Sequence, residues 1–201
     1  MTYETVSDSE RAYFDTSMWT AILLHNVSQA DLGFVYDKFR ELKRGTFHVY
    51  ASDMVLMECS WAIRRRIAER KESASMSPDD LQREIDAKVA QFYEQIVQAQ
   101  NAGMITVENP TDSLDHFLQR SHDLSRRPQK RTLHYREKRK QYQYIGAGFL
   151  DFQHAIIAAR LGCSRVYTLD RGFNIFSSIP EFRTLTIITP QYRIPENGAK
   201  F

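Results

Sequence analysis

The sequence predicts an α/β fold in which helices cover both faces of a central parallel β-sheet of about four to five strands. Short segments of strand-forming residues alternate with longer segments whose apolar residues recur every three to four positions. Hydrophobic residues make up 42% of the 201 residues, enough for a sizeable core, and no linker or repeat divides the chain. We therefore expect a single domain over residues 1–201.

Two strands, each followed by a helix, are predicted in the first third of the chain. The segment AYFD at 12–15 indicates a buried strand, and the segment MWTAILLHN at 18–26 indicates a helix. A second strand is expected at 47–52, where Phe, Val and Tyr favour extended backbone. Ser52 is then the N-cap of a helix with an apolar stripe as far as Ile67.

The clearest helix of the chain is predicted from residue 77 onwards. Residues 77–80, SPDD, provide an N-cap, a first-turn proline and two acids that suit the positive end of the helix dipole. Gly103 stands where a left-handed helix cap is expected, and a strand follows at 104–108. Asp112 can cap a further helix that carries apolar residues from Leu114 to Leu124.

The last third of the chain predicts one long helix and two more strands. The helix runs from about 146 to 161 and stops at Gly162. Strands are expected at 165–170 (RVYTLD) and at 184–189 (TLTIIT), with a short turn or helix at 173–176 between them. Strands that alternate with helices form a parallel sheet with right-handed connections.

Several classes of function are disfavoured by composition. No apolar run approaches the ~20 residues of a membrane span, and the opening segment has neither a basic leader nor an apolar core, so we expect a cytoplasmic protein without a membrane partner. Cys59 and Cys163 match no zinc or C-x-x-C spacing and are expected to be buried thiols. None of the eight glycines forms a phosphate-binding motif, so nucleotide-cofactor binding is not supported.

Four acids stand at positions where a carboxylate needs an explanation. Asp15 and Asp170 close two predicted strands, whose carboxyl ends meet at one edge of a parallel sheet. Glu58 and Asp151 stand inside otherwise apolar helical faces, where an ionised carboxylate is costly to bury without a partner or a metal. Each acid alone could be a helix cap or an ion-pair partner. Together the four predict a functional site.

Four converging carboxylates cannot all stay ionised without help, because neighbouring negative charges raise one another's pKa values. A divalent cation removes this conflict. Oxygen-only ligands favour Mg²⁺ or Mn²⁺ over zinc, and Mg²⁺ keeps waters and substrate phosphate in its coordination shell. The composition of the site therefore points to a phosphodiester substrate.

Three stretches resemble the PIN-domain nucleases, especially the VapC-type toxin ribonucleases of bacterial and archaeal toxin–antitoxin pairs. These stretches are FDTS around the first acid, SDMVLMECSWAI around the second, and LDFQHAIIAARLGCSRVYTLDRGF around the third and fourth. The resemblance implies a PIN-like, Rossmann-like fold and a metal-dependent endoribonuclease. Many relatives carry another acid where this chain has Gly172, which bears on a second metal site.

The resemblance also assigns residues and partners. Asp15, Glu58, Asp151 and Asp170 would be the catalytic residues and would hold one or two Mg²⁺ or Mn²⁺ ions, while Thr16, Ser17 and Thr168 would orient the carboxylates by hydrogen bonds. The implied partners are an RNA substrate, a cognate antitoxin protein and a second copy of the chain in a homodimer. The main hypothesis is the toxin of a type II toxin–antitoxin pair.

A basic insertion at about 124–145 concentrates the positive charge of the chain. Residues 126–140 hold eight Lys or Arg against one Glu, whereas the whole chain carries a net charge of only +2. These cations could bind RNA phosphates, with Tyr135, Tyr142 and Tyr144 available to stack on bases. The segment could equally be a solvated loop or a docking surface for an acidic partner. The candidate RNA-binding residues are Arg126, Arg127, Lys130, Arg131, Arg136, Lys138, Arg139 and Lys140.

Other functions remain open at this point. One is a non-catalytic PIN-like scaffold that binds RNA or a protein through the basic insertion, and another is a PIN nuclease of RNA processing outside toxin–antitoxin systems. A metal-free ribonuclease would use a pair of histidines from His116, His122 and His134. His154, one turn after Asp151, is expected to be a packed helix residue rather than a ligand.

Overall fold

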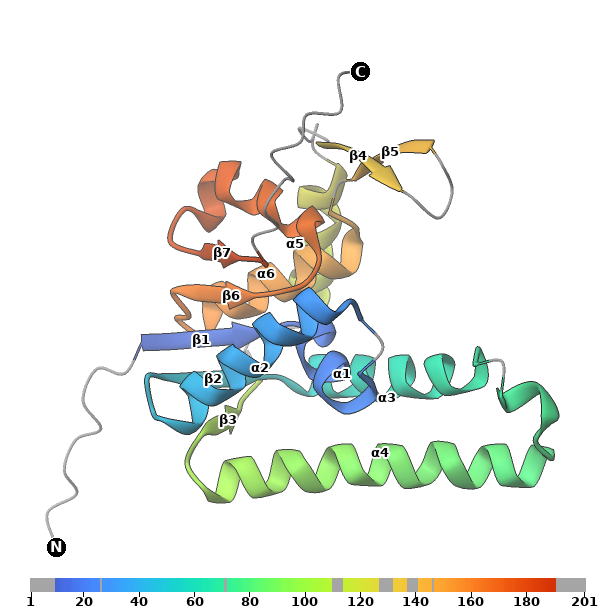
Figure 1. Cartoon of the computed structure of the whole chain (residues 1–201). Helices are drawn as coiled ribbons and strands as arrows, with labels where there is room; N and C mark the ends of the chain where they lie inside the picture. The colour runs from blue at the N-terminus through green and yellow to red at the C-terminus, as the bar shows by residue number, and fades with distance from the viewer. Residues whose placement is uncertain are drawn as a thin grey trace, which may run out of the picture.

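The computed structural model describes residues 10–25, 27–70, 72–109, 114–126, 132–136, 141–145 and 147–190. At its centre lies a five-stranded, all-parallel sheet with strand order β3-β2-β1-β6-β7 (Figure 1). The predicted α/β class and the central parallel sheet are confirmed. The strands of this sheet are β1 Glu10–Phe14, β2 Phe47–Ala51, β3 Ile105–Val107, β6 Arg165–Tyr167 and β7 Thr186–Ile188.

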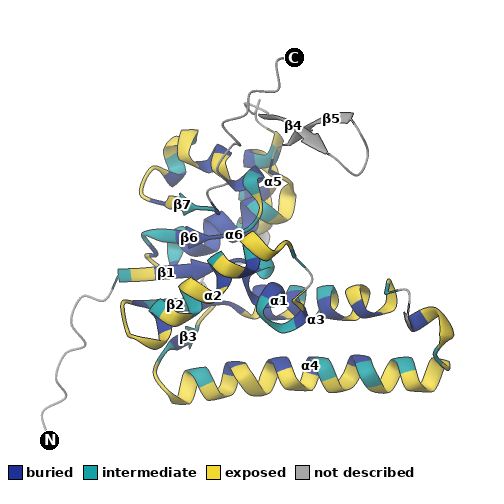
Figure 2. Cartoon of the chain, viewed as in Figure 1, coloured by how far each residue is buried: buried dark blue, intermediate teal, exposed yellow. Residues whose placement is uncertain are grey.

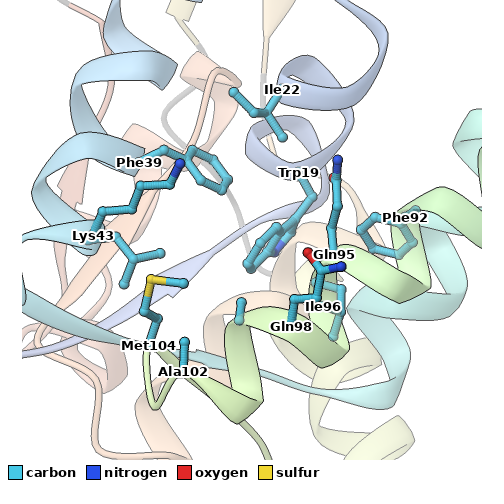
Figure 3. Close-up of a pocket in the computed structure, with 12 residues that line it drawn as sticks. Trp19, Ile22, Phe39, Lys43, Phe92, Gln95, Ile96, Gln98, Ala102 and Met104 are labelled. Carbon is cyan, nitrogen blue, oxygen red and sulfur yellow. The ribbon is translucent and has the colours of Figure 1, made fainter.

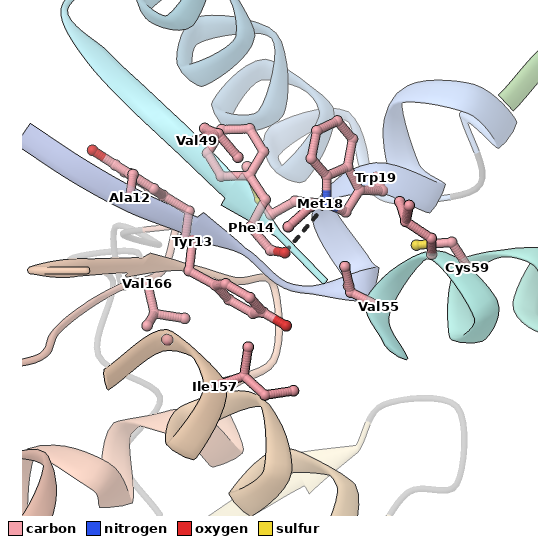
Figure 4. Packing of buried hydrophobic residues seen from close by; sticks show 14 of the residues in the cluster. Ala12, Tyr13, Phe14, Met18, Trp19, Val49, Val55, Cys59, Ile157 and Val166 are labelled. Atoms are coloured by element: carbon pink, nitrogen blue, oxygen red, sulfur yellow. Dashed lines mark hydrogen bonds between the residues drawn. The ribbon is translucent and has the colours of Figure 1, made fainter. Parts of the chain in front are cut away.

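Helices cover both faces of the sheet, as predicted. Tyr13 and Phe14 are neighbours on β1 and point to opposite faces (Figure 4). The Tyr13 hydroxyl reaches His154 on α6, whereas the Phe14 ring packs against Trp19 of α1 and Phe39 of α2. The helices are α1 Thr16–Leu24, α2 Gln29–Lys43, α3 Asp53–Ala68, η1 Glu72–Ser75, α4 Pro78–Asn101, α5 Leu114–Arg126, α6 Phe149–Arg160, η3 Arg171–Ser178 and η4 Pro180–Phe182.

The register of the central strand decides which loops meet. Strand β1 pairs in parallel with β2 on one side and with β6 on the other, where Phe14 lies opposite Tyr167. The pairing continues past the strand, because the Asp15 N–H donates to the Tyr167 carbonyl at 3.2 Å. The segments after β1 and β6, more than 150 positions apart in sequence, therefore lie side by side at the carboxyl edge.

Several predicted helix ends are confirmed. The Ser52 hydroxyl accepts from the Val55 N–H at the start of α3, and the Ser77 hydroxyl accepts from the Asp80 N–H at the start of α4. Gly162 follows α6 with a φ of +68°, a conformation that favours glycine. Asp112 and residue 146, which the sequence places at two other helix starts, lie outside the described residues.

Two segments differ from the prediction. Helix α2 was not predicted, although Leu32, Val35 and Leu42 are buried on it. Helix α5 extends into the start of the basic insertion and ends at Arg126. The insertion also contains two antiparallel strands, so the interpretation of this segment as a loop is wrong for these strands. The Tyr, Thr and Ile residues of these strands explain the extended backbone, because residues of these types favour strands. The hairpin strands are β4 Thr132–Arg136 and β5 Gln141–Ile145.

Helices α3 and α4 form an arm that extends beyond the sheet (Figure 1). The 24 residues of α4 correspond to a length of about 36 Å. One narrow stripe of α4 is buried and the opposite side is exposed (Figure 2). Within the described part of the chain, no helix combines the length and apolar character needed to cross a membrane.

Candidate active site

Asp15 is the most deeply buried of the four predicted acids. It lies at the end of β1 and caps α1, with a 4% exposed side chain. Its Oδ1 accepts from the Ser17 N–H at 3.0 Å, the Ser17 hydroxyl at 2.6 Å and the Met18 N–H at 3.2 Å. Burial raises the pKa of Asp15, and hydrogen bonds from Ser17 and Thr168 offset only part of this effect. Asp15 is therefore both a helix cap and a buried carboxylate.

Two hydroxyls tie the loop after β6 to Asp15. The Thr168 hydroxyl donates to Asp15 Oδ2 at 2.7 Å and accepts from the Asp170 N–H at 2.9 Å. The Ser17 hydroxyl, which donates to Asp15, accepts from the Leu169 N–H at 2.8 Å. Each hydroxyl thus links the Asp15 carboxylate, which follows β1, to a backbone N–H of the loop that follows β6.

Asp170 is exposed and lies three residues beyond the end of β6, not at the end of the strand as predicted. Tyr167 is the last paired residue of β6 and lies opposite Phe14 of β1 and Ile188 of β7. The Asp170 Oδ1 accepts from the Gly172 N–H at 2.7 Å and caps η3. The Thr168 hydroxyl holds the Asp170 backbone next to Asp15.

Glu58 has the polar partners that its place on an apolar helix requires. Its Oε2 accepts from the Thr16 hydroxyl at 2.8 Å and lies 2.5 Å from His154 Nε2. Burial raises the pKa of Glu58, but hydrogen bonding and charge from His154 and the Thr16 hydroxyl outweigh it, so the pKa is lowered overall. Glu58 is therefore ionised at neutral pH.

His154 is a site residue that the sequence reasoning missed. It is 3% exposed, as expected for a packed residue, but both ring nitrogens have polar partners. Nε2 lies against Glu58, and Nδ1 lies 2.8 Å from the Tyr13 hydroxyl. Its position three residues after Asp151 could have indicated a place in the site, because that spacing puts both residues on one face of a helix.

Asp151 lies in the first turn of α6, not inside an apolar helical face as predicted. Its Oδ2 accepts from the Gly148 N–H at 2.6 Å, so it closes the helix start. Burial raises the pKa of Asp151 to about 6, helped by the negative charges of Asp170 and Asp15. The Gly148 bond and His154 act in the opposite direction. The charges of three predicted acids thus act on one another.

The four acids are suited to a hard cation by their donor chemistry. Among the residues that the structure describes, no three His, Cys, Asp or Glu side chains stand close enough together to hold a metal ion. In that same part of the chain, Glu58 Oε1, Asp151 Oδ1 and Asp170 Oδ2 accept no hydrogen bond. Free carboxylate oxygens fit Mg²⁺ or Mn²⁺, and Mg²⁺ commonly binds through one or two carboxylates and retained waters.

Most of the predicted RNA-binding cations lie outside the described residues. Arg126 is exposed at the end of α5, and the backbone of Arg136 lies in β4. The cations beyond the described residues are Arg127, Lys130, Arg131, Lys138, Arg139 and Lys140. Among the histidines considered for a metal-free ribonuclease, His122 is exposed, with Nδ1 3.8 Å from the Asp123 carboxylate.

A separate pocket of about 500 Å³ lies between α1, α2 and α4 (Figure 3). Its lining is mostly apolar and includes Trp19, Phe39, Phe92 and Ile96, with Lys43 among the polar residues. None of the four predicted acids lines it. The carboxylates and the pocket are therefore distinct features of the molecule.

Comparisons with known proteins find little likeness. No family model matches the chain, and no curated protein matches it. Among solved structures, the VapC20 toxin of Mycobacterium tuberculosis, described as cleaving the sarcin–ricin loop, is 16% identical. The match covers 81% of this chain and 92% of that chain, with a TM-score of 0.47. Likeness at this level assigns no role to any residue.

Proposed function

We propose that this protein is a metal-dependent endoribonuclease of the PIN type, which hydrolyses RNA phosphodiester bonds. The observation that carries the proposal is the Thr168 hydroxyl, which joins Asp15 to the Asp170 backbone at the carboxyl edge of the sheet. His154, which lies against Glu58, lowers the pKa values of both Glu58 and Asp151. This set of oxygen donors favours a hard cation and a phosphate substrate.

The four acids have different parts in the proposed reaction. When bound, Mg²⁺ or Mn²⁺ supplies a water of lowered pKa and neutralises charge on the scissile phosphate. Glu58 offers an ionised carboxylate at neutral pH because His154 lowers its pKa. Asp15, fixed by its hydrogen bonds, offers a carboxylate with little freedom to move. Asp151 and Asp170 complete the set from the starts of α6 and η3.

The proposed biological setting is the toxin of a type II toxin–antitoxin pair, acting in the cytoplasm as a homodimer that a cognate antitoxin inhibits. The sequence resemblance around the four acids supports this setting. The basic insertion is proposed to hold RNA phosphates. A PIN nuclease of RNA processing would use the same site. A neighbouring gene for an acidic antitoxin would favour the toxin over the RNA-processing nuclease.

A non-catalytic scaffold is the second candidate. It is favoured by the open arrangement of the acids, since no three potential ligands in the described ranges stand ready to hold a metal. It is disfavoured by the presence of all four acids and by the hydroxyls bonded to two of them. The scaffold predicts RNA binding without cleavage.

The test is cleavage of a structured RNA with Mn²⁺ and with EDTA. Wild type is compared with Asp15→Asn, Asp170→Asn and the control Asp37→Asn, which removes an exposed carboxylate on α2. We expect Mn²⁺-dependent cleavage by wild type and the control, and a loss of at least about 100-fold in both site variants, in the range seen when one essential group is removed. Activity that survives EDTA and both site substitutions rules the proposal out.

A further inference from the structure

A continuous line of polar groups runs from the buried Tyr13 on β1 through the buried His154 on α6 to the half-buried Glu58 on α3. The Tyr13 hydroxyl lies 2.8 Å from His154 Nδ1, and His154 Nε2 lies 2.5 Å from Glu58 Oε2. Tyr13 is fully buried and His154 is 3% exposed. Figure 4 shows the Tyr13 side chain pointing from β1 towards Ile157 of α6. Polar groups this deep are retained only where their hydrogen bonds are made.

The two contacts of His154 fix the position of its ring. A carboxylate oxygen can only accept, so His154 Nε2 donates to Glu58 Oε2. On the other side of the ring, Nδ1 lies 2.8 Å from the hydroxyl of the buried Tyr13. With both ring nitrogens engaged, the imidazole is held in one orientation, and Tyr13 orients the ring that contacts Glu58.

Both donors to Glu58 converge on the same oxygen. The Thr16 hydroxyl and His154 Nε2 both contact Oε2, while Oε1 accepts no hydrogen bond from any described residue. Two donors from different helices hold the carboxylate against rotation. They leave one oxygen of an ionised carboxylate available for a ligand.

We propose that His154, oriented by Tyr13, is a positioning residue that presents Glu58 Oε1 to a divalent cation. The inference rests on the proposed function for the identity of the cation. His154 is not itself a ligand, because both of its nitrogens are engaged. The sequence motifs around the four acids assign His154 no role, and the contact is visible only once α3, α6 and β1 are packed together.

The test uses isothermal titration of Mn²⁺ alone into the full chain. His154→Leu removes the donor to Glu58, and we expect Mn²⁺ affinity to fall about 10- to 100-fold, as for other residues that orient metal ligands. His154→Gln retains an N–H that can reach Glu58, and we expect affinity within about threefold of wild type on the same basis. Tyr13→Phe keeps the ring but frees His154, and we expect an intermediate loss.

Two measurements separate positioning from a general loss of stability. Thermal unfolding is recorded for every variant, together with Ile157→Val, a buried control on α6 that removes one methylene group and retains both donors to Glu58. In wild type, ¹⁵N NMR of the imidazole should show a protonated Nε2 that is hydrogen-bonded to Glu58. In Tyr13→Phe this hydrogen bond should weaken.

The possible outcomes are distinguishable. Equal Mn²⁺ affinity in wild type and His154→Leu overturns the inference, even if wild type cleaves RNA and the nuclease proposal stands. Equal losses in His154→Leu, His154→Gln and Ile157→Val also overturn it, since they indicate a structural role alone. If affinity follows the expected order but wild type cleaves no RNA, positioning holds and the nuclease proposal fails. A wild type that binds no Mn²⁺ overturns both.

Discussion

Thr168 and Asp15 stand 153 positions apart in sequence, yet the Thr168 hydroxyl lies 2.7 Å from Asp15 Oδ2. The parallel pairing of β1 with β6 brings them together, because both residues follow directly on paired strand ends. The same hydroxyl accepts from the Asp170 N–H. One buried oxygen thus connects the acid after the first strand to the loop that carries the acid after the sixth.

Replacing Thr168 with Val should therefore destabilise the protein. The substitution keeps the shape of the side chain but removes one donor from Asp15 and the acceptor of the Asp170 N–H. A buried polar group left without its partner costs about 1–3 kcal/mol. Urea denaturation measures this loss. Thr186→Val, on an exposed strand position, should stay within about 0.5 kcal/mol of wild type. A Thr168→Val variant as stable as this control contradicts the prediction.

Divalent cations should stabilise the folded wild-type protein. A ligand that binds only the folded state at 100 times its dissociation constant contributes about 2.7 kcal/mol. For a chain of this length, that contribution should raise the melting temperature by about 5–10 °C. Asp170→Asn should lose most of this increase, while its stability without metal changes little because Asp170 is exposed. Differential scanning fluorimetry with Mn²⁺ checks both statements, and an equal shift in both proteins excludes Asp170 as a ligand.

Asp15 could be placed at the end of a strand from the sequence because a strand and the helix after it have local patterns. The apolar run before Asp15 and the Ser52 cap before α3 are visible in a few neighbouring residues. Helix α2 was missed because Gly33 and several charged residues interrupt its apolar positions. The contacts of His154 could not be predicted, since Tyr13 lies 141 positions away and only the packing of α6 on the sheet brings them together.

The sequence also placed Asp151 wrongly, inside an apolar helical face, because local pattern does not show where α6 begins. Its neighbours in sequence are apolar, and periodicity alone cannot show that α6 begins only two residues earlier, at Phe149. The hydrogen bond from the Gly148 N–H is a property of the helix start. The local pattern therefore singled out Asp151 but did not show its surroundings.

Stability should depend on pH through Asp151. Its folded pKa of about 6 lies above the reference value of 3.8, so the folded protein binds this proton more tightly than the unfolded chain. The contribution to stability is present below pH 3.8 and is lost as the pH rises through about 6. Relative to Asp151→Asn, wild type should lose stability over this interval. Melting temperatures measured at intervals from about pH 4 to 8 test this prediction.

The contribution of Glu58 to stability should change with pH in the opposite direction to that of Asp151, so Glu58 serves as an internal comparison. Its folded pKa is lowered from the reference value of 4.5, so its contribution to stability is present above that value and is lost as the pH falls through the folded pKa. Relative to Glu58→Gln, wild type should become less stable in acid. A pH trend of the same sign for Asp151 and Glu58 contradicts the assigned environments.

The basic insertion should determine the salt dependence of RNA binding. Each phosphate contact adds about 0.7 to the slope of log affinity against log salt for a single-stranded RNA. Replacing Lys138, Arg139 and Lys140 with Gln should therefore reduce the slope by about 2. The matched control replaces Arg40, Arg66 and Arg83, three exposed arginines on α2, α3 and α4, and should leave the slope unchanged. Fluorescence anisotropy in the presence of EDTA measures binding without metal-dependent cleavage. Equal slopes in the insertion variant and wild type would show that RNA is held elsewhere, because counterion release reports only the cations that contact phosphate.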